Sequence, residues 1–287
     1  MAVPVVQSYN SNTSAASASL TITKPTGLSV GDLLVAYITS ISTSHSPQTP
    51  TNWSAQYAQQ MINGNNNFYA SCFTKVADSA DVAASNFTFT TSVAVGGIGG
   101  TLLRVSGVAP GNEIEGISVS NDTDGNTTAS FSTSSTPRMA DSLLLAAFAK
   151  YDDGGSASGY ASTPTKTWTE IVDIGFTVGG YDAQYCIASA TAGSTDTITN
   201  FQTTLSSNTV GVTGSLLRIN AVVNATGTNA LFSISPLIST QNGTAGAIGT
   251  NALFSISPNI STQSGSATAP TQWISESKPS TTWTSET

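Results

Sequence analysis

The sequence predicts an all-β protein made of two tandem antiparallel β-sandwiches followed by a C-terminal tail. Three observations predict it: short segments that alternate apolar and polar residues, an internal duplication, and a change of pattern near residue 223. Alternation with a period of two is typical of a strand with one buried face. We predict a first sandwich at residues 1–111, a second at 112–223, and a repeat-containing β-structured or extended tail at 224–287.

Two kinds of strand are expected in each sandwich. Residues 19–23 and 86–90 alternate, as half-buried strands do, whereas 33–38 and 143–148 are continuous apolar runs of strand length. The continuous runs indicate central strands that are buried on both faces. Clusters of Gly, Asn, Pro and Ser separate the strands, and no segment shows a capped helical pattern. A jelly roll is the preferred topology, and an immunoglobulin-like sandwich is the alternative.

The duplication rests on blocks that recur in the same order. Gly-Thr-Leu-Leu-Arg-Val at 100–105 returns as Gly-Ser-Leu-Leu-Arg-Ile at 214–219, a shift of 114. The same shift relates Cys72 to Cys186, and each copy also carries a tryptophan a few residues after a Pro-Thr pair. Equivalent positions in two domains seldom meet, so we expect two buried free thiols rather than a disulfide. The tryptophans, Trp53 and Trp168, are expected in the cores.

The composition excludes two classes of function. Charged residues make up 8% of the chain and the net charge is −8, whereas soluble domains carry about 25% charged residues. A surface that neutralises phosphates needs clustered Lys and Arg, so we expect no nucleic-acid partner. No run of about 18 apolar residues exists, so we expect no membrane insertion. The first residues lack the basic and apolar regions of a signal peptide, which predicts synthesis in the cytoplasm of a host cell.

The tail has its own repeat. The ten residues 227–236 return unaltered at 249–258, a period of 22, and each copy places a phenylalanine and an isoleucine on one face of a strand. Those faces require cover, so we expect the tail to dock on another protein or on a second copy of itself, by strand addition or apolar contact. A disordered linker is the alternative. The predicted docking residues are Phe232, Ile234, Phe254, Ile256, Trp273 and Trp283.

No catalytic residues are predicted, and we expect no enzymatic activity. The only histidine, His45, lies in the polar segment 42–47 without a nucleophile motif, which favours a solvated loop residue. Glu113 and Glu115 would share one side of a strand. The β-sandwich glycosidases with an acidic strand motif need a further carboxylate a few residues on, which is missing here.

Two binding sites are candidates. Residues 121–126 alternate oxygen-bearing side chains with a glycine, so Asp122, Asp124 and Asn126 are candidate calcium ligands, although a simple Asx turn is favoured. No other cofactor is expected. Amide and aromatic side chains together are typical of sugar sites, and the loops combine both types. The candidate glycan-binding residues are Asn65, Asn67, Tyr69 and Tyr181.

Three motifs resemble one class of known proteins. These are Gly-Asp-Leu-Leu-Val-Ala at 31–36, the Pro-x-x-Trp at 50–53, and Lys-Pro-Ser-Thr-Thr-Trp-Thr at 278–284. Together with the duplication they resemble structural proteins of tailed-bacteriophage virions, which often join jelly-roll-like domains and end in such short repeats. The resemblance implies a structural or surface role, as capsid decoration, head fibre or tail-associated protein. It identifies no functional residues.

Two hypotheses of function follow. The first is a non-enzymatic structural component of a phage particle, a capsid-decoration or head-surface protein that is anchored by one end. Its partners would be other virion proteins, either major capsid or tail proteins, and further copies of itself in a homo-oligomer. The alternative is a tail-associated or fibre protein that acts as an adhesin and binds a host glycan. Both hypotheses place the protein in the virion.

Overall fold

The computed structural model describes residues 3–63, 66–122, 127–135, 141–151, 157–178, 181–193, 196–205 and 211–222. The chain divides into a compact unit of residues 1–228 and a second unit of residues 229–287. The predicted tail and its docking residues lie outside the described residues. Within the described residues the fold is all-β with antiparallel sheets, which confirms that part of the predicted fold class.

Fourteen strands and one short helix make up the described fold. Their bounds are β1 Val5–Thr23, β2 Leu33–Ser42, β3 Pro47–Gln48, β4 Ser54–Asn63, β5 Asn66–Val76, α1 Ser79–Ala83, β6 Asn86–Ser106, β7 Ile114–Asp122, β8 Thr128–Ser135, β9 Ser142–Lys150, β10 Ala157–Thr163, β11 Thr169–Val178, β12 Tyr181–Ala192, β13 Ile198–Leu205 and β14 Val212–Ile219. The predicted boundary between residues 111 and 112 falls between β6 and β7.

The first half forms one sheet in the order β1-β6-β2-β5-β4, with β3 paired to the outer part of β6. β1 and β6 pair along almost their whole length, but their register shifts between Ser17 and Ser19, next to Ala16 with a positive φ of 47°. Such a bulge bends and twists a strand pair. Leu20 and Phe89, beyond the bend, therefore pack over Leu34 on the same sheet and close the first core.

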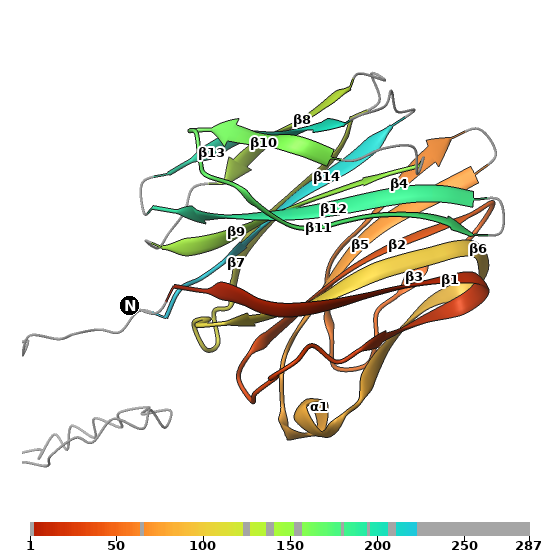
Figure 1. Cartoon of the computed structure of the whole chain (residues 1–287), viewed down its shortest axis with the longest axis horizontal. Coiled ribbons are helices and arrows are strands. Elements are labelled where there is room, and N and C mark those ends of the chain that lie inside the picture. Colours follow the sequence, from red (N-terminus) through yellow and green to blue (C-terminus); the bar gives the residue numbers. More distant parts are fainter. Residues whose placement is uncertain are drawn as a thin grey trace, which may run out of the picture. The chain divides into compact units, whose positions relative to one another are not determined.

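The second half forms two sheets, with the orders β11-β12-β9-β14-β7 and β10-β13-β8. The three-stranded sheet covers one face of the five-stranded sheet, and aromatic rings fill the space between them. Phe131 of β8 lies 5.5 Å from Phe148 of β9 and 5.4 Å from Phe201 of β13, measured between ring centroids. In Figure 1 this sheet pair lies above the sheet that contains β1, β6 and β2.

The continuous apolar runs are buried on both faces, as predicted. In β2, Leu33 and Val35 contact a different cluster from Leu34. In β9, Leu145 and Phe148 are likewise divided between two clusters. Successive side chains of a strand point to opposite faces, so one face of each run packs inside its own half. The other face of both runs contributes to a third cluster that the two halves share.

The shared cluster joins the halves. It contains eleven buried residues from the first half and eleven from the second. The five-stranded sheet of the second half therefore packs against the sheet formed by the first half. Gly99 of β6 permits one close approach, because a Cβ there would lie 2.6 Å from the Phe176 ring of β11. Burial of a large apolar side chain contributes about 1.5–3 kcal/mol, so this cluster is a major part of the stability of the unit.

Three sequence predictions are resolved in these cores. Cys72 and Cys186 are buried free cysteines, as expected. Trp53 packs edge-on against Phe89 in the first core, and Trp168 packs on the second. The helix α1 was not expected: Asp78 caps it by accepting from the backbone N–H of Asp81, whose side chain accepts from Asp78 in return.

Candidate functional site

The candidate calcium ligands are only partly described. Asp122 ends β7, and its Oδ2 accepts a hydrogen bond from the backbone N–H of Ser130 at 2.9 Å, which ties β7 to β8. Asp124 and Asn126 lie outside the described residues. In the described part of the chain, no group of three or more His, Cys, Asp or Glu side chains is close enough to hold a metal ion. The described contact of Asp122 is that of a residue in a strand connection.

The candidate glycan residues fall on two different hairpins. Asn67 and Tyr69 lie on β5, after the turn from β4, whereas Tyr181 is the first residue of β12, opposite Val178 of β11. The backbones of Asn67 and Tyr181 are described but their side chains are not, and Asn65 lies outside the described residues. The Tyr69 ring is half-buried and stands 4.9 Å from the His45 ring in an edge-on contact.

The expectation that His45 is a solvated loop residue is wrong. Its side chain is only 7% exposed, and its Nε2 hydrogen-bonds the Ser40 hydroxyl of β2 at 2.8 Å. The Tyr69 ring also contacts the imidazole edge-on. Burial lowers the pKa of His45. The segment is polar in sequence, but its imidazole closes over two strands of the sheet, so it has a structural role.

A groove of about 780 Å³ lies between the edges of the two stacked sheets. Its first wall is the segment Val3–Tyr9, which contains the two residues before β1 and the first five residues of β1. Its second wall contains Thr169, Glu170 and Ile171 of β11 and the neighbouring end of β12. β1 and β11 are each the last strand of their sheet. We call this hollow the β1–β11 groove.

Both edge strands are irregular where they line the groove. The register of β1 with β6 skips Gln7, and the register of β11 with β12 skips Ile171. Each skipped residue is a bulge, a feature that is common at sheet edges and next to functional sites. Gln7 is held in place because its side-chain amide donates to the Ser106 hydroxyl at 2.9 Å. The bulges make it harder for the sheet of another molecule to pair edge to edge along these strands.

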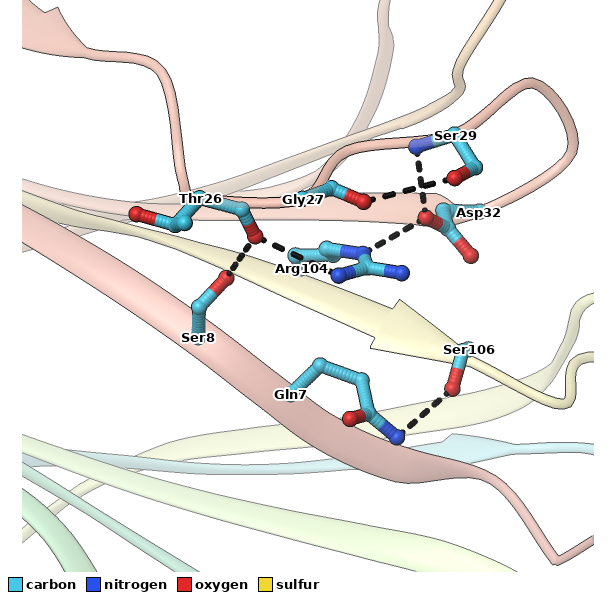
Figure 2. A network of polar contacts seen from close by, with 8 residues as sticks. All are labelled: Gln7, Ser8, Thr26, Gly27, Ser29, Asp32, Arg104 and Ser106. Carbon is cyan, nitrogen blue, oxygen red and sulfur yellow. Dashed lines mark hydrogen bonds and ion pairs between the residues drawn. The ribbon is translucent and has the colours of Figure 1, made fainter.

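A polar network behind the first wall fixes its position (Figure 2). Arg104 of β6 donates from Nε to Asp32 Oδ2 at 2.6 Å and from Nη1 to the Thr26 carbonyl at 3.2 Å. The Ser8 hydroxyl of β1 donates to the same carbonyl at 2.8 Å. Asp32 also accepts from the backbone N–H of Ser29 at 2.8 Å. One arginine thus ties the turn before β2 to the strand that lines the groove.

A second hollow of about 540 Å³ lies between β4 and the start of β7. β4 and β7 end the opposite sides of the two sheets, and both strands also contain bulges, at Gln56 and Glu115. Its chemistry differs, because three charged residues line it. They are Lys75, Asp78 and Glu113. We call this hollow the β4–β7 groove.

Exposed apolar side chains gather at these grooves. The described residues contain six large apolar side chains that are exposed. Three of them, Val3, Val5 and Tyr9, line the β1–β11 groove, where they are 38, 47 and 44% exposed. Val76 lines the β4–β7 groove. Scattered apolar residues are normal on a protein surface, whereas these three lie in a local row beside one groove.

Five ion pairs occur among the described residues, and one of them is the longer contact between Lys75 and Asp78 at 3.4 Å. Lys75 pairs with Asp81 of α1 at 2.7 Å, and Arg104 pairs with Asp32. The other two are Lys166 with Asp196 and Arg218 with Glu115. The other four pairs each connect separate segments within one half of the chain. The charges at these positions therefore hold strand connections in place.

The comparisons supply no relative. Neither a scan against models of protein families nor searches of curated proteins and of solved structures finds a match. None of the described helices has the length and apolar character required to cross a membrane.

The β1–β11 groove was not predicted from the sequence because its walls are strand edges from two halves of the chain. Its one local signal was the Val-x-Val spacing at residues 3 and 5.

Proposed function

We propose that this chain is a non-enzymatic structural component of a bacteriophage particle, and specifically a capsid-decoration or head-surface protein anchored by its C-terminal tail. The observation that carries the proposal is the shared core, in which eleven buried residues of each half lock two layered halves into one body. Two layered halves on one apolar core form a rigid unit with few charges, which is a suitable component of a larger assembly. The motifs at 31–36, 50–53 and 278–284 point in the same direction.

We propose further that the two halves are duplicated jelly-roll sandwiches. The order β4-β5-β2-β6-β1 in the first half corresponds strand by strand to β11-β12-β9-β14-β7 in the second. The ends of β1 and β6 with β3 correspond in the same way to β8, β13 and β10. Pairing of the first strand with the last, and of the last with the third, is a jelly-roll pairing. Equal orders in both halves are what a duplication produces.

Quantitative mass spectrometry of purified particles tests the proposal. We expect the protein in the particle at a copy number comparable to that of the capsid lattice, in the hundreds. A few to dozens of copies would place it at the tail, as the adhesin alternative requires. Absence from purified particles would refute the virion role. For the adhesin, a glycan array without binders above background would exclude a host glycan as partner.

A further inference from the structure

We propose that the β1–β11 groove receives an extended segment from a second copy of this chain, namely one of the two identical stretches at residues 230–235 and 252–257. The proposal deepens the assembly role proposed above and rests on it. It turns a general expectation of docking into a defined pair of surfaces.

The walls offer main-chain hydrogen-bonding groups. The first five residues of β1, Val5 to Tyr9, line one side and three consecutive residues of β11 line the other, so the groove follows the strands lengthwise. In a strand at the end of a sheet, alternate N–H and C=O groups point away from the neighbouring strand. A groove between two such edges fits an extended polypeptide, which binds through its own backbone.

The exposed side chains of the first wall have the spacing of a strand. Val3 and Val5 are two positions apart, and Tyr9 follows beyond the Gln7 bulge. A strand presents every second side chain on one face, so an added strand covers such a row with its own alternate residues. The segment Ala-Leu-Phe-Ser-Ile-Ser supplies that pattern, with Ala, Phe and Ile on one face.

The charge of the groove selects an uncharged occupant. Glu170 is the only charged residue among its lining residues, and its Oε2 accepts a hydrogen bond from the Tyr160 hydroxyl at 3.2 Å. Neither copy of the segment contains a charged residue, and only three of the residues 225–287 are charged. An uncharged segment enters the groove without the free-energy cost of removing an ion from water, and Glu170 does not repel it.

Each chain carries enough segments to supply a second copy as well as itself. The segment occurs twice in each chain, whereas the described unit has one groove with this lining. Val222, the last described residue, hydrogen-bonds the Gly107 carbonyl, and Gly107 packs against the Val3 backbone. The described part of the chain therefore ends beside the groove, and seven residues in extended form reach at most ~25 Å. Two neighbouring copies can exchange segments at this position. Each copy then gives one segment and receives one, as in a dimer with twofold symmetry.

Sedimentation of the full chain at several concentrations tests the proposal. The variant Val5→Lys places a charge in the groove, and Val93→Lys is its matched control, because Val93 is 49% exposed and lines neither groove. We expect Val5→Lys to weaken self-association at least about tenfold, and Val93→Lys to leave it unchanged. The double variant Phe232→Ser/Phe254→Ser should weaken it equally. Circular dichroism and thermal unfolding establish that each variant folds.

Each other outcome overturns the proposal in a recognisable way. Equal association of the Val5→Lys and Val93→Lys variants would refute the groove. If the phenylalanine variant alone weakens association, the tail assembles elsewhere and the proposed function stands. A wild-type chain that stays monomeric at all concentrations would contradict exchange between copies. In a mixture of isotopically light and heavy Val5→Cys/Phe232→Cys protein, disulfides confined to single chains would show that a chain fills its own groove.

Discussion

The Tyr185 hydroxyl of β12 hydrogen-bonds the Thr101 hydroxyl of β6 across the interface of the two halves, over 2.9 Å. Ser215 occupies the place of Thr101 in the second copy of the repeat, and it bonds the Tyr57 hydroxyl of the first half over 2.9 Å. Each half thus offers a hydroxyl from its last strand to a tyrosine of the other. Burial raises the pKa of Tyr185 to about 12, so this hydroxyl stays neutral near pH 7.

Removal of the Tyr185 hydroxyl should destabilise the whole unit. Tyr185→Phe leaves Thr101 with one partner fewer in a buried interface, which costs about 1–2 kcal/mol of the free energy of unfolding. Urea denaturation measures this loss. The matched control is Tyr9→Phe, because Tyr9 is 44% exposed and its change should stay within ~0.5 kcal/mol. Equal effects of the two variants would contradict a stabilising contact across the interface.

Gly99 should tolerate no side chain. In Gly99→Ala the new Cβ would lie 2.6 Å from Phe176 Cε1, and Phe176 is buried, so the sheets must separate locally. Overpacking of this kind costs about 1–3 kcal/mol. Thermal or urea unfolding of the variant measures it.

Two controls separate this clash from a general glycine effect. At Gly116 an added Cβ meets nothing within 4 Å, so Gly116→Ala should change the free energy of unfolding by less than ~0.5 kcal/mol. In the Phe176→Leu background, Gly99→Ala should cost less than it does alone, because the ring is gone. A fully additive pair would show that Phe176 is not the cause.

Stability should fall as the solution becomes mildly acidic, because His45 is buried. Burial lowers its pKa below the unfolded value of about 6.5, so the unfolded chain binds the proton first as pH decreases. The free energy of unfolding then declines below about pH 6.5, by at most ~1.4 kcal/mol per pH unit, until folded His45 is protonated. Urea midpoints between pH 7.5 and pH 5 measure the slope. His45→Gln should flatten it, and an unchanged slope would assign the effect to other groups.

The Arg104–Asp32 contact should require the shape of the arginine. A lysine at position 104 cannot donate to Asp32 and to the Thr26 carbonyl in the same geometry. Arg104→Lys should therefore cost about 1–2 kcal/mol in urea unfolding. Both side chains are largely buried, at 18 and 10% exposure, so the loss should hardly change between low and high salt. A penalty that disappears in salt would indicate a weak surface pair.

Both thiols should be inert in the folded protein. Burial raises the pKa of Cys72 and of Cys186, and neither side chain is more than 1% exposed. The thiolate is the reactive form, so a thiol reagent at neutral pH should label neither cysteine until the chain unfolds. Titration in guanidinium should then count two thiols. Rapid labelling of the native protein would contradict the burial of that site.

The sequence predicted those parts of the fold that depend on local patterns. The runs 33–38 and 143–148 indicated strands buried on both faces, and the position of the cysteines in each copy indicated free thiols. The apolar pattern could not show what covers the second face of each run. That cover is the other half, and recognising it requires the packing of one sheet against the other in space. The predicted jelly-roll topology, the duplication and the docking residues stay predictions.

The site was less accessible to sequence reasoning, for physical reasons. His45 lies among Ser and Thr residues, so only the three-dimensional contact with Ser40 and Tyr69 shows that it is buried. The β1–β11 groove is made largely of main-chain edges, which every residue type possesses and no sequence pattern records. The row of exposed residues beside it includes Val3 and Val5, and an isolated valine pair at a chain start has no specific meaning.

Because the two halves belong to one chain, the two sides of the described unit can carry different surfaces. A pair of identical chains must present the same chemistry on both flanks, because any mutation appears on both. Here both halves belong to one chain, and each flank can change by itself. One flank carries Val3, Val5 and Tyr9, and the other carries Lys75 and Glu113. The body therefore has a front and a back, so neighbours meeting it from the two sides find different surfaces.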